Sequence, residues 1–135
     1  MTQPHSRAYT RRRPQITTVI VVGGGPALTE FIHRSLGQHE EQPEVITTML
    51  PSELMQQLRR RNVPLVVCDD SAPCLRSFQM LGEIKARSPH SRVALIVPGG
   101  SAEQEQRARL AGADEYLPQA FALKRLRTII DELFA

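Results

Sequence analysis

The chain has 135 residues and a mass of 15.1 kDa, which suits one domain with an ordinary hydrophobic core. Hydrophobic residues make up 41% of it and charged residues 23%, which excludes wholesale disorder, a collagen-like fibre and a disulfide scaffold. No apolar run approaches the roughly 18 residues that span a bilayer, so we expect no membrane segment. An aromatic content of 4%, without tryptophan, argues against a base-stacking platform for nucleic acid.

The positive charge is concentrated at the N-terminus. Residues 1–15 hold four arginines and no acidic residue, whereas the remainder holds 13 basic and 14 acidic residues. We expect a disordered basic tail at 1–15, able at most to contact nucleic acid or an acidic partner weakly, and one domain at 16–135. Cys68 and Cys74 are too few for a disulfide framework, and we expect two small core residues in a reducing cytoplasm.

From Ile16 onward, short apolar runs alternate with amphipathic stretches. Strands are predicted at 16–22, 45–49, 65–68, 93–97 and 115–117. Helices are predicted at 26–36, 51–61, 74–87, 101–112 and 122–134. This alternation predicts an α/β fold with a parallel sheet covered on both faces. At this length we expect the flavodoxin-like, doubly wound (βα)5 arrangement with strand order 2-1-3-4-5.

Hydrophobic spacing predicts which helical positions face the sheet. The expected inward residues of helix 74–87 are Phe78, Leu81, Ile84 and Lys85. Those of helix 122–134 are Leu123, Leu126, Ile130 and Leu133. Ser101, followed three residues later by Gln104, predicts a capping box for the helix that ends near Gly112.

Ligands and chemistry in such sheets lie outside the carboxyl ends of the strands. The segments expected to meet there are the glycine loop 23–25, residues 69–73, residues 97–100 and Gln119. The loop 23–25 is either a tight turn or a weak candidate for a phosphate cradle, because Leu28 replaces the third glycine of a dinucleotide fingerprint. Asp69 and Asp70 can likewise end a strand and cap the following loop.

Two stretches carry a family resemblance. Asp69 stands four residues before Pro73, and residues 112–118 read Gly-Ala-Asp-Glu-Tyr-Leu-Pro. With these features, residues 16–135 resemble the receiver domain of two-component response regulators. The resemblance implies a non-enzymatic cytoplasmic signalling module in a phosphorelay, with Asp69 equivalent to the phosphoacceptor and Tyr116 at the position of the switch aromatic.

The sequence departs from this family at the remaining reactive positions. Gly23 and Gly24 replace the acidic pair that helps hold Mg²⁺, Val97 replaces a Ser or Thr, and Gln119 replaces a Lys. Mg²⁺ requires a near-octahedral shell of oxygens, so Asp69 would hold it nearly alone. We therefore expect a degenerate pseudo-receiver with no catalytic residue and no cofactor, which acts through protein contacts.

Two alternatives remain open. In the first, the domain is a working receiver that is phosphorylated on Asp69 with Mg²⁺. In the second, the glycine loops 23–25 and Gly99-Gly100 bind a small ligand in the space that missing side chains leave. Three histidines show no metal-ligand spacing and are expected on the solvated surface: His33, His39 and His90.

The resemblance also implies where partners bind. The family's usual partner or dimer surface combines the fourth helix, fifth strand and fifth helix. Its residues here would be Glu103, Arg107, Tyr116, Lys124 and Arg127. A histidine kinase, an output protein or a second copy of the chain is the expected partner.

Overall fold

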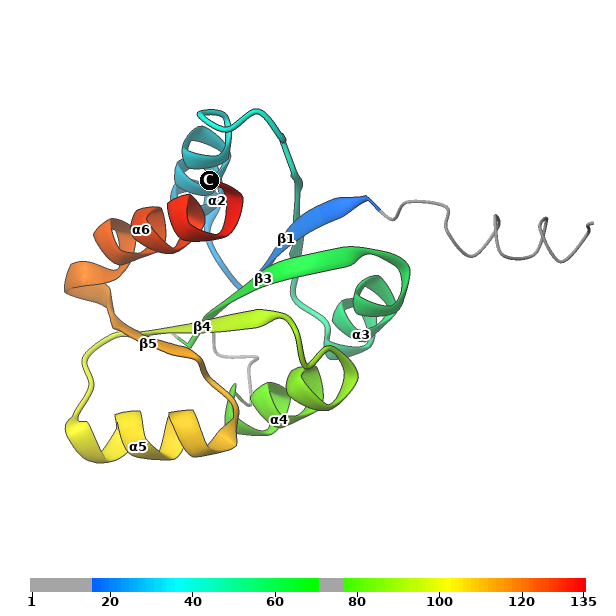
Figure 1. The fold of residues 1–135 in the computed structure, drawn as a ribbon. Helices are drawn as coiled ribbons and strands as arrows, with labels where there is room; N and C mark the ends of the chain where they lie inside the picture. The colour runs from blue at the N-terminus through cyan, green and yellow to red at the C-terminus, as the bar shows by residue number, and fades with distance from the viewer. Residues whose placement is uncertain (1–15, 71–76) are drawn as a thin grey trace, which may run out of the picture.

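The computed structural model describes residues 16–70 and 77–135 (Figure 1). The expectations for the tail 1–15, for Pro73 and for Cys74 lie outside these residues. Five parallel strands form one sheet in the order β2-β1-β3-β4-β5, which confirms the predicted doubly wound topology. Within the described residues, no helix is long and apolar enough to cross a membrane.

The elements alternate strictly along the chain. The strands are β1 (Thr17–Val22), β2 (Glu44–Thr48), β3 (Asn62–Asp69), β4 (Arg92–Val97) and β5 (Glu115–Pro118). The helices are α2 (Pro26–Leu36), α3 (Pro51–Arg60), α4 (Ser77–Arg87), α5 (Ala102–Ala111) and α6 (Ala122–Phe134), with a short 3₁₀ turn, η1 (Gln119–Phe121), before α6. Ser101 caps α5 as predicted, because its hydroxyl accepts a hydrogen bond from the Gln104 backbone N–H at 3.1 Å.

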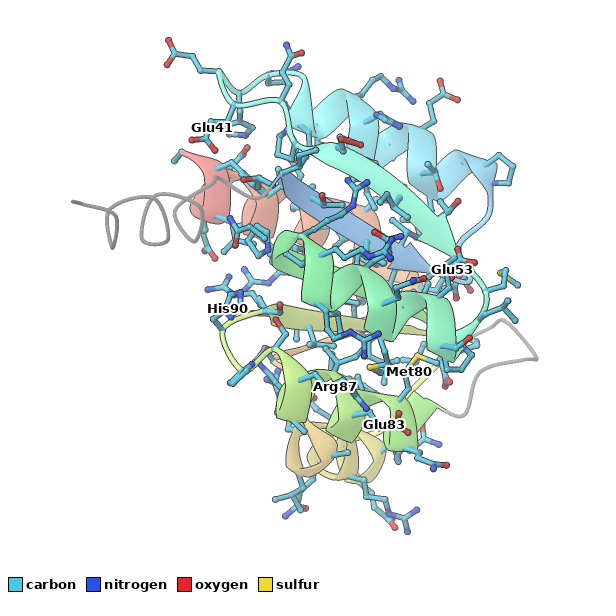
Figure 2. The ribbon with its side chains drawn as sticks, turned by 90° about the vertical axis from the view of Figure 1, so that its right-hand side faces the viewer. Glu41, Glu53, Met80, Glu83, Arg87 and His90 are labelled. Carbon is cyan, nitrogen blue, oxygen red and sulfur yellow. The ribbon has the colours of Figure 1, made fainter. Side chains whose placement is uncertain are left out.

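Two helical layers cover the sheet. Helices α2 and α6 lie on one face and α3, α4 and α5 on the other (Figure 1). Alternate strand residues face the two layers, so Val19 and Val21 join one apolar cluster and Ile20 and Val22 the other. Met80 of α4 faces α3 and belongs to the same cluster as Ile20 and Val22 (Figure 2). Burial on both faces explains why these strands are continuous apolar runs.

Strand β3 begins earlier than the sequence predicted. It starts at Asn62 and includes Pro64, which has no backbone N–H to donate to a ladder. The register between β1 and β3 shifts between Thr17 and Val19, opposite this proline. A proline within a strand is tolerated at such an irregularity. The predicted strand began only at Leu65, directly after Pro64, because proline is rare inside a strand.

Two predicted inward side chains point outward. Phe78 is 39% exposed, and the inward residues of α4 are Met80, Leu81 and Ile84. Leu123 is 47% exposed, because it occupies the first turn of α6 at the margin of the buried stripe. The fully buried residues of α6 are Leu126, Ile129 and Ile130.

A polar network joins α4 to the amino end of β4. The Lys85 ammonium lies 2.6 Å from the Asp114 carboxylate and donates to the Ser91 carbonyl at 2.7 Å. The same carboxylate accepts a hydrogen bond from the Val93 backbone N–H at 2.8 Å. The network therefore fixes the start of β4 against the loop between α5 and β5.

Candidate functional site

The strand registers bring the predicted residues to one edge of the sheet. Val22 pairs with Cys68, so Gly23 and Asp69 leave β1 and β3 side by side. Asp69 pairs with Ile96, and the Asp70 backbone N–H donates to the Ile96 carbonyl at 2.8 Å. Val97 pairs with Pro118, which places Gln119 directly after the neighbouring strand β5. For the residues that the structure describes, the registers agree with the convergence expected at the carboxyl ends of the strands, and residues 71–73 lie outside them.

The residues that follow β1, end β4 and follow β5 at this edge bring no charged side chain, in contrast to the two aspartates. Asp69 is half-buried at the end of β3, and Gly23 contributes no side chain beside it. Val97 is only 5% exposed and belongs to the apolar cluster on the α3, α4 and α5 face. Gln119 is exposed in η1 and brings an uncharged amide.

The receiver family implies a Mg²⁺ ion at such an edge, and the described residues do not fit one. Glycines at positions 23 and 24 supply no side-chain oxygen for an octahedral shell. Among residues 16–70 and 77–135, no group of three or more His, Cys, Asp or Glu side chains gathers closely enough to hold a metal ion. Asp69 and Asp70 bring carboxylates at the end of β3, and Glu53 of α3 lines the depression beside Gly24.

Tyr116 points into the domain. It is 8% exposed and packs in the same apolar cluster as Val97, and its hydroxyl donates to Gln104 Oε1 at 3.4 Å. A Cβ built on Gly100 would come within 2.6 Å of that hydroxyl. Only glycine at position 100 leaves room for this ring position.

The two glycine loops do not simply open space, as the ligand alternative supposed. A Cβ on Gly25 or Gly99 would meet nothing within 4 Å, but one on Gly24 or Gly100 would collide with side chains. Gly24 instead borders two surface depressions, with volumes of about 390 and 430 Å³. Thr47 at the edge of the sheet lines both of them.

Cys68 lies one residue before Asp69 and is buried, as expected for a small core residue. Burial raises the pKa of its thiol to about 12, and the nearby charge of Asp70 adds to the rise. A thiol with this pKa carries almost no thiolate at neutral pH, so Cys68 is not a nucleophile in the folded domain.

The surface formed by α5, β5 and α6, which we call the α5-β5-α6 face, carries four of the five charged or aromatic residues predicted for it. Glu103 and Arg107 form an exposed pair at 3.0 Å, and Lys124 and Arg127 are exposed on α6. The prediction was wrong for Tyr116, because its ring is buried. Two leucines that the prediction did not include, Leu110 and Leu123, are exposed on this face.

His39 is not a solvated surface residue. Its side chain is only 13% exposed, its Nε2 lies 2.9 Å from Asp131 Oδ1, and its ring lies 6.4 Å from that of Phe134. The pair joins the segment after α2 to the end of α6. Sequence spacing gave no sign of it, because the partners are far apart along the chain.

The comparisons with known proteins agree with this architecture. No protein-family model matches the sequence. The response regulator protein FleR of Pseudomonas aeruginosa is 28% identical over 114 residues, which cover 83% of this chain and 23% of FleR. The chain therefore spans less than a quarter of the length of that relative.

Among the solved structures that are similar in fold, two bear on function. The beryllofluoride-activated receiver domain dimer of NtrC4 has a TM-score of 0.71 at 26% identity, covering 87% of this chain and 95% of that one. An atypical orphan response regulator, described as having a phosphorylation-independent regulatory mechanism, has a TM-score of 0.69 at 19% identity, covering 87% and 94%. The chain has the CheY-like fold of response-regulator receiver domains and is similar to them in sequence.

Proposed function

We propose that this chain is a receiver-type signalling module whose output does not depend on phosphorylation of Asp69. The observation that supports it most is the composition of the carboxyl edge. Glycine ends β1 beside Asp69, a buried valine ends β4, and an uncharged glutamine follows β5. The atypical orphan regulator of similar fold provides a precedent for this kind of regulation.

The chemistry explains why these residues count against phosphoryl transfer. The reaction is accelerated mainly by positioning and by neutralising charge on the transferred group. Gly23 and Gly24 supply no side-chain ligand to a metal, and Gln119 supplies no cation next to the phosphoryl oxygens. Val97 has no hydroxyl that could hydrogen-bond to a phosphorylated Asp69. The domain would therefore work as a non-enzymatic module without a cofactor.

Protein contacts are the means of signalling that this proposal requires. The α5-β5-α6 face presents exposed charges of both signs and the exposed leucines Leu110 and Leu123. Such a mixture suits a protein partner, whether a histidine kinase, an output protein or a second copy of the chain. The solved receiver domain of NtrC4 is itself described as a dimer.

The test is exposure of the chain to acetyl phosphate or beryllofluoride with Mg²⁺. We expect intact-mass spectrometry to find no stoichiometric phosphorylated species, and NMR to find no shift of the Tyr116 resonances. Asp69→Asn should behave like the parent in both measurements, and Asp70→Asn serves as the control. A phosphorylated species that disappears in Asp69→Asn but persists in Asp70→Asn would contradict the proposal and show a working receiver.

The depressions beside Gly24 support a second candidate function, the binding of a small ligand. Their volumes of about 390 and 430 Å³ fall within the usual range of ligand sites. Native mass spectrometry of the purified chain tests this function. Thr47→Trp places a large side chain at the wall that the two depressions share. A bound small molecule that is lost in this variant supports ligand binding, and a bare chain mass contradicts it.

A further inference from the structure

The end of β1 has an unusual backbone. Gly23 has a φ of 78°, in the left-handed region that residues with side chains seldom adopt. Gly24 does not share this φ, but a Cβ built on it would lie 2.7 Å from Val21 Cγ1 and 2.8 Å from Leu28 Cδ2. Carbon atoms pack at roughly 3.5–4.0 Å, so these neighbours must move before any side chain fits at position 24.

The two neighbours differ in how easily they can move. Val21 is completely buried in β1, and its β-branched side chain has few alternative rotamers. Leu28 is half-buried in the first turn of α2 and contacts the same apolar cluster only at its margin. The atom of Leu28 that blocks Gly24 is the end of a flexible side chain. Val21 is therefore the stronger obstacle.

We propose that the end of β1 is built around glycine, so that no carboxylate at position 24 can be accommodated without displacing Val21 and Leu28. The backbone of Gly23 opposes one at the preceding position. The proposed function rests on the absence of carboxylate ligands at positions 23 and 24. The packing of this loop then excludes such ligands, in addition to the glycines that stand there. Restoring the acidic pair by substitution would not restore a metal site.

The first test is a pair of variants in the same loop, each of which adds a Cβ to one glycine. Gly24→Ala should lower the thermal midpoint by at least about 4 °C, because the added methyl overpacks Val21. Gly25→Ser is the matched control, since the Gly25 backbone is extended at φ −82° and ψ 176°, a Cβ there would meet nothing within 4 Å, and serine is favoured at this N-cap of α2. It should shift the midpoint by less than about 2 °C. Equal effects of the two variants would overturn the proposal.

The second test asks whether the named neighbours cause the loss. In a Val21→Ala background, Gly24→Ala should lower the thermal midpoint by less than half as much as in the parent, because the blocking Cγ1 is gone. In a Leu28→Ala background the relief should be smaller. An undiminished loss in both backgrounds would overturn the assignment. If the double variant at positions 21 and 24 fails to fold, the comparison in the Leu28→Ala background still tests the assignment.

The third test uses Mg²⁺ itself. Gly24→Asp should be less stable than the parent, and calorimetric titration with MgCl₂ should give no heat of binding and no rise in thermal midpoint. Binding of Mg²⁺ by this variant, whatever its stability, would overturn the steric exclusion. The unchanged chain is titrated in parallel, and binding there would contradict the proposed function while leaving the packing conflict at Gly24 intact.

Discussion

The ring of Tyr116 lies against the backbone of Gly100, where a Cβ would come within 2.6 Å of the Tyr116 hydroxyl and 3.1 Å of its ring. Gly100 has a φ of 131°, which side-chain-bearing residues rarely adopt. The loop after β4 and the aromatic residue of β5 are thus fitted to each other. Neither can change without affecting the other.

This relationship predicts a cost for Gly100→Ala. We expect a loss of about 2 kcal/mol in the free energy of unfolding, from the strained φ and from displacement of Tyr116. Near-ultraviolet circular dichroism should report the altered tyrosine environment, and urea unfolding measures the loss. Gly99→Ala is the control, because a Cβ there meets nothing within 4 Å, and it should be neutral or slightly stabilising. Equal stability of the two variants would contradict the predicted contact.

The Asp114 carboxylate predicts a graded response to substitution. Asp114→Ala removes both the ion pair to Lys85 and the hydrogen bond from the Val93 backbone, and should cost about 1–2 kcal/mol because the group is partly exposed. Asp114→Asn keeps an acceptor for Val93 and should cost less. Arg107→Ala breaks only an exposed pair with Glu103 and should stay within about 0.5 kcal/mol. Urea unfolding that ranks these variants differently would count against the network.

The strand order and most element bounds could be predicted because parallel strands buried on both faces leave continuous apolar runs. Ile20 and Val22 face one helical layer while Val19 and Val21 face the other, so every position is apolar. The start of β3 could not be predicted because of Pro64. The register shift that tolerates this proline cannot be recognised from the sequence.

The candidate site was predictable in position but not in packing. The registers place Asp69, Val97 and Gln119 at one edge, as the alternation of strands and helices implied. The inward position of Tyr116 and the closed space at Gly24 depend on contacts between distant segments. A sequence shows that glycine lacks a side chain, but only the fold shows whether the space is empty or filled by a neighbour.

Burial of Cys68 predicts resistance to thiol reagents. Because its pKa is raised from 9.0 to about 12, the thiolate fraction at pH 8 falls on the order of a thousandfold in the folded state. In a Cys74→Ser variant, labelling with a disulfide reagent should be slow when folded and fast in denaturant. Rapid labelling of the folded variant would show that Cys68 is accessible.

The same shift gives a pH dependence of stability. Between pH 9 and about 12 the unfolded chain loses the Cys68 proton while the folded chain keeps it. This contribution to stability is therefore complete below pH 9 and declines as the pH rises toward 12. Cys68→Ala should flatten that decline in urea unfolding at alkaline pH, and an unchanged slope would contradict the assignment.

Helix α6 provides a test of which side chains hold the domain together and which remain available to a partner. Leu126 and Ile130 are completely buried against the sheet, so Leu126→Ala or Ile130→Ala should cost about 2–5 kcal/mol through lost burial and a residual cavity. Leu123→Ala removes the same kind of side chain from a position that is 47% exposed, and should cost less than about 1 kcal/mol. Urea unfolding followed by circular dichroism measures all three. A large loss for Leu123→Ala would show that this residue packs in the core and would remove it from the α5-β5-α6 face.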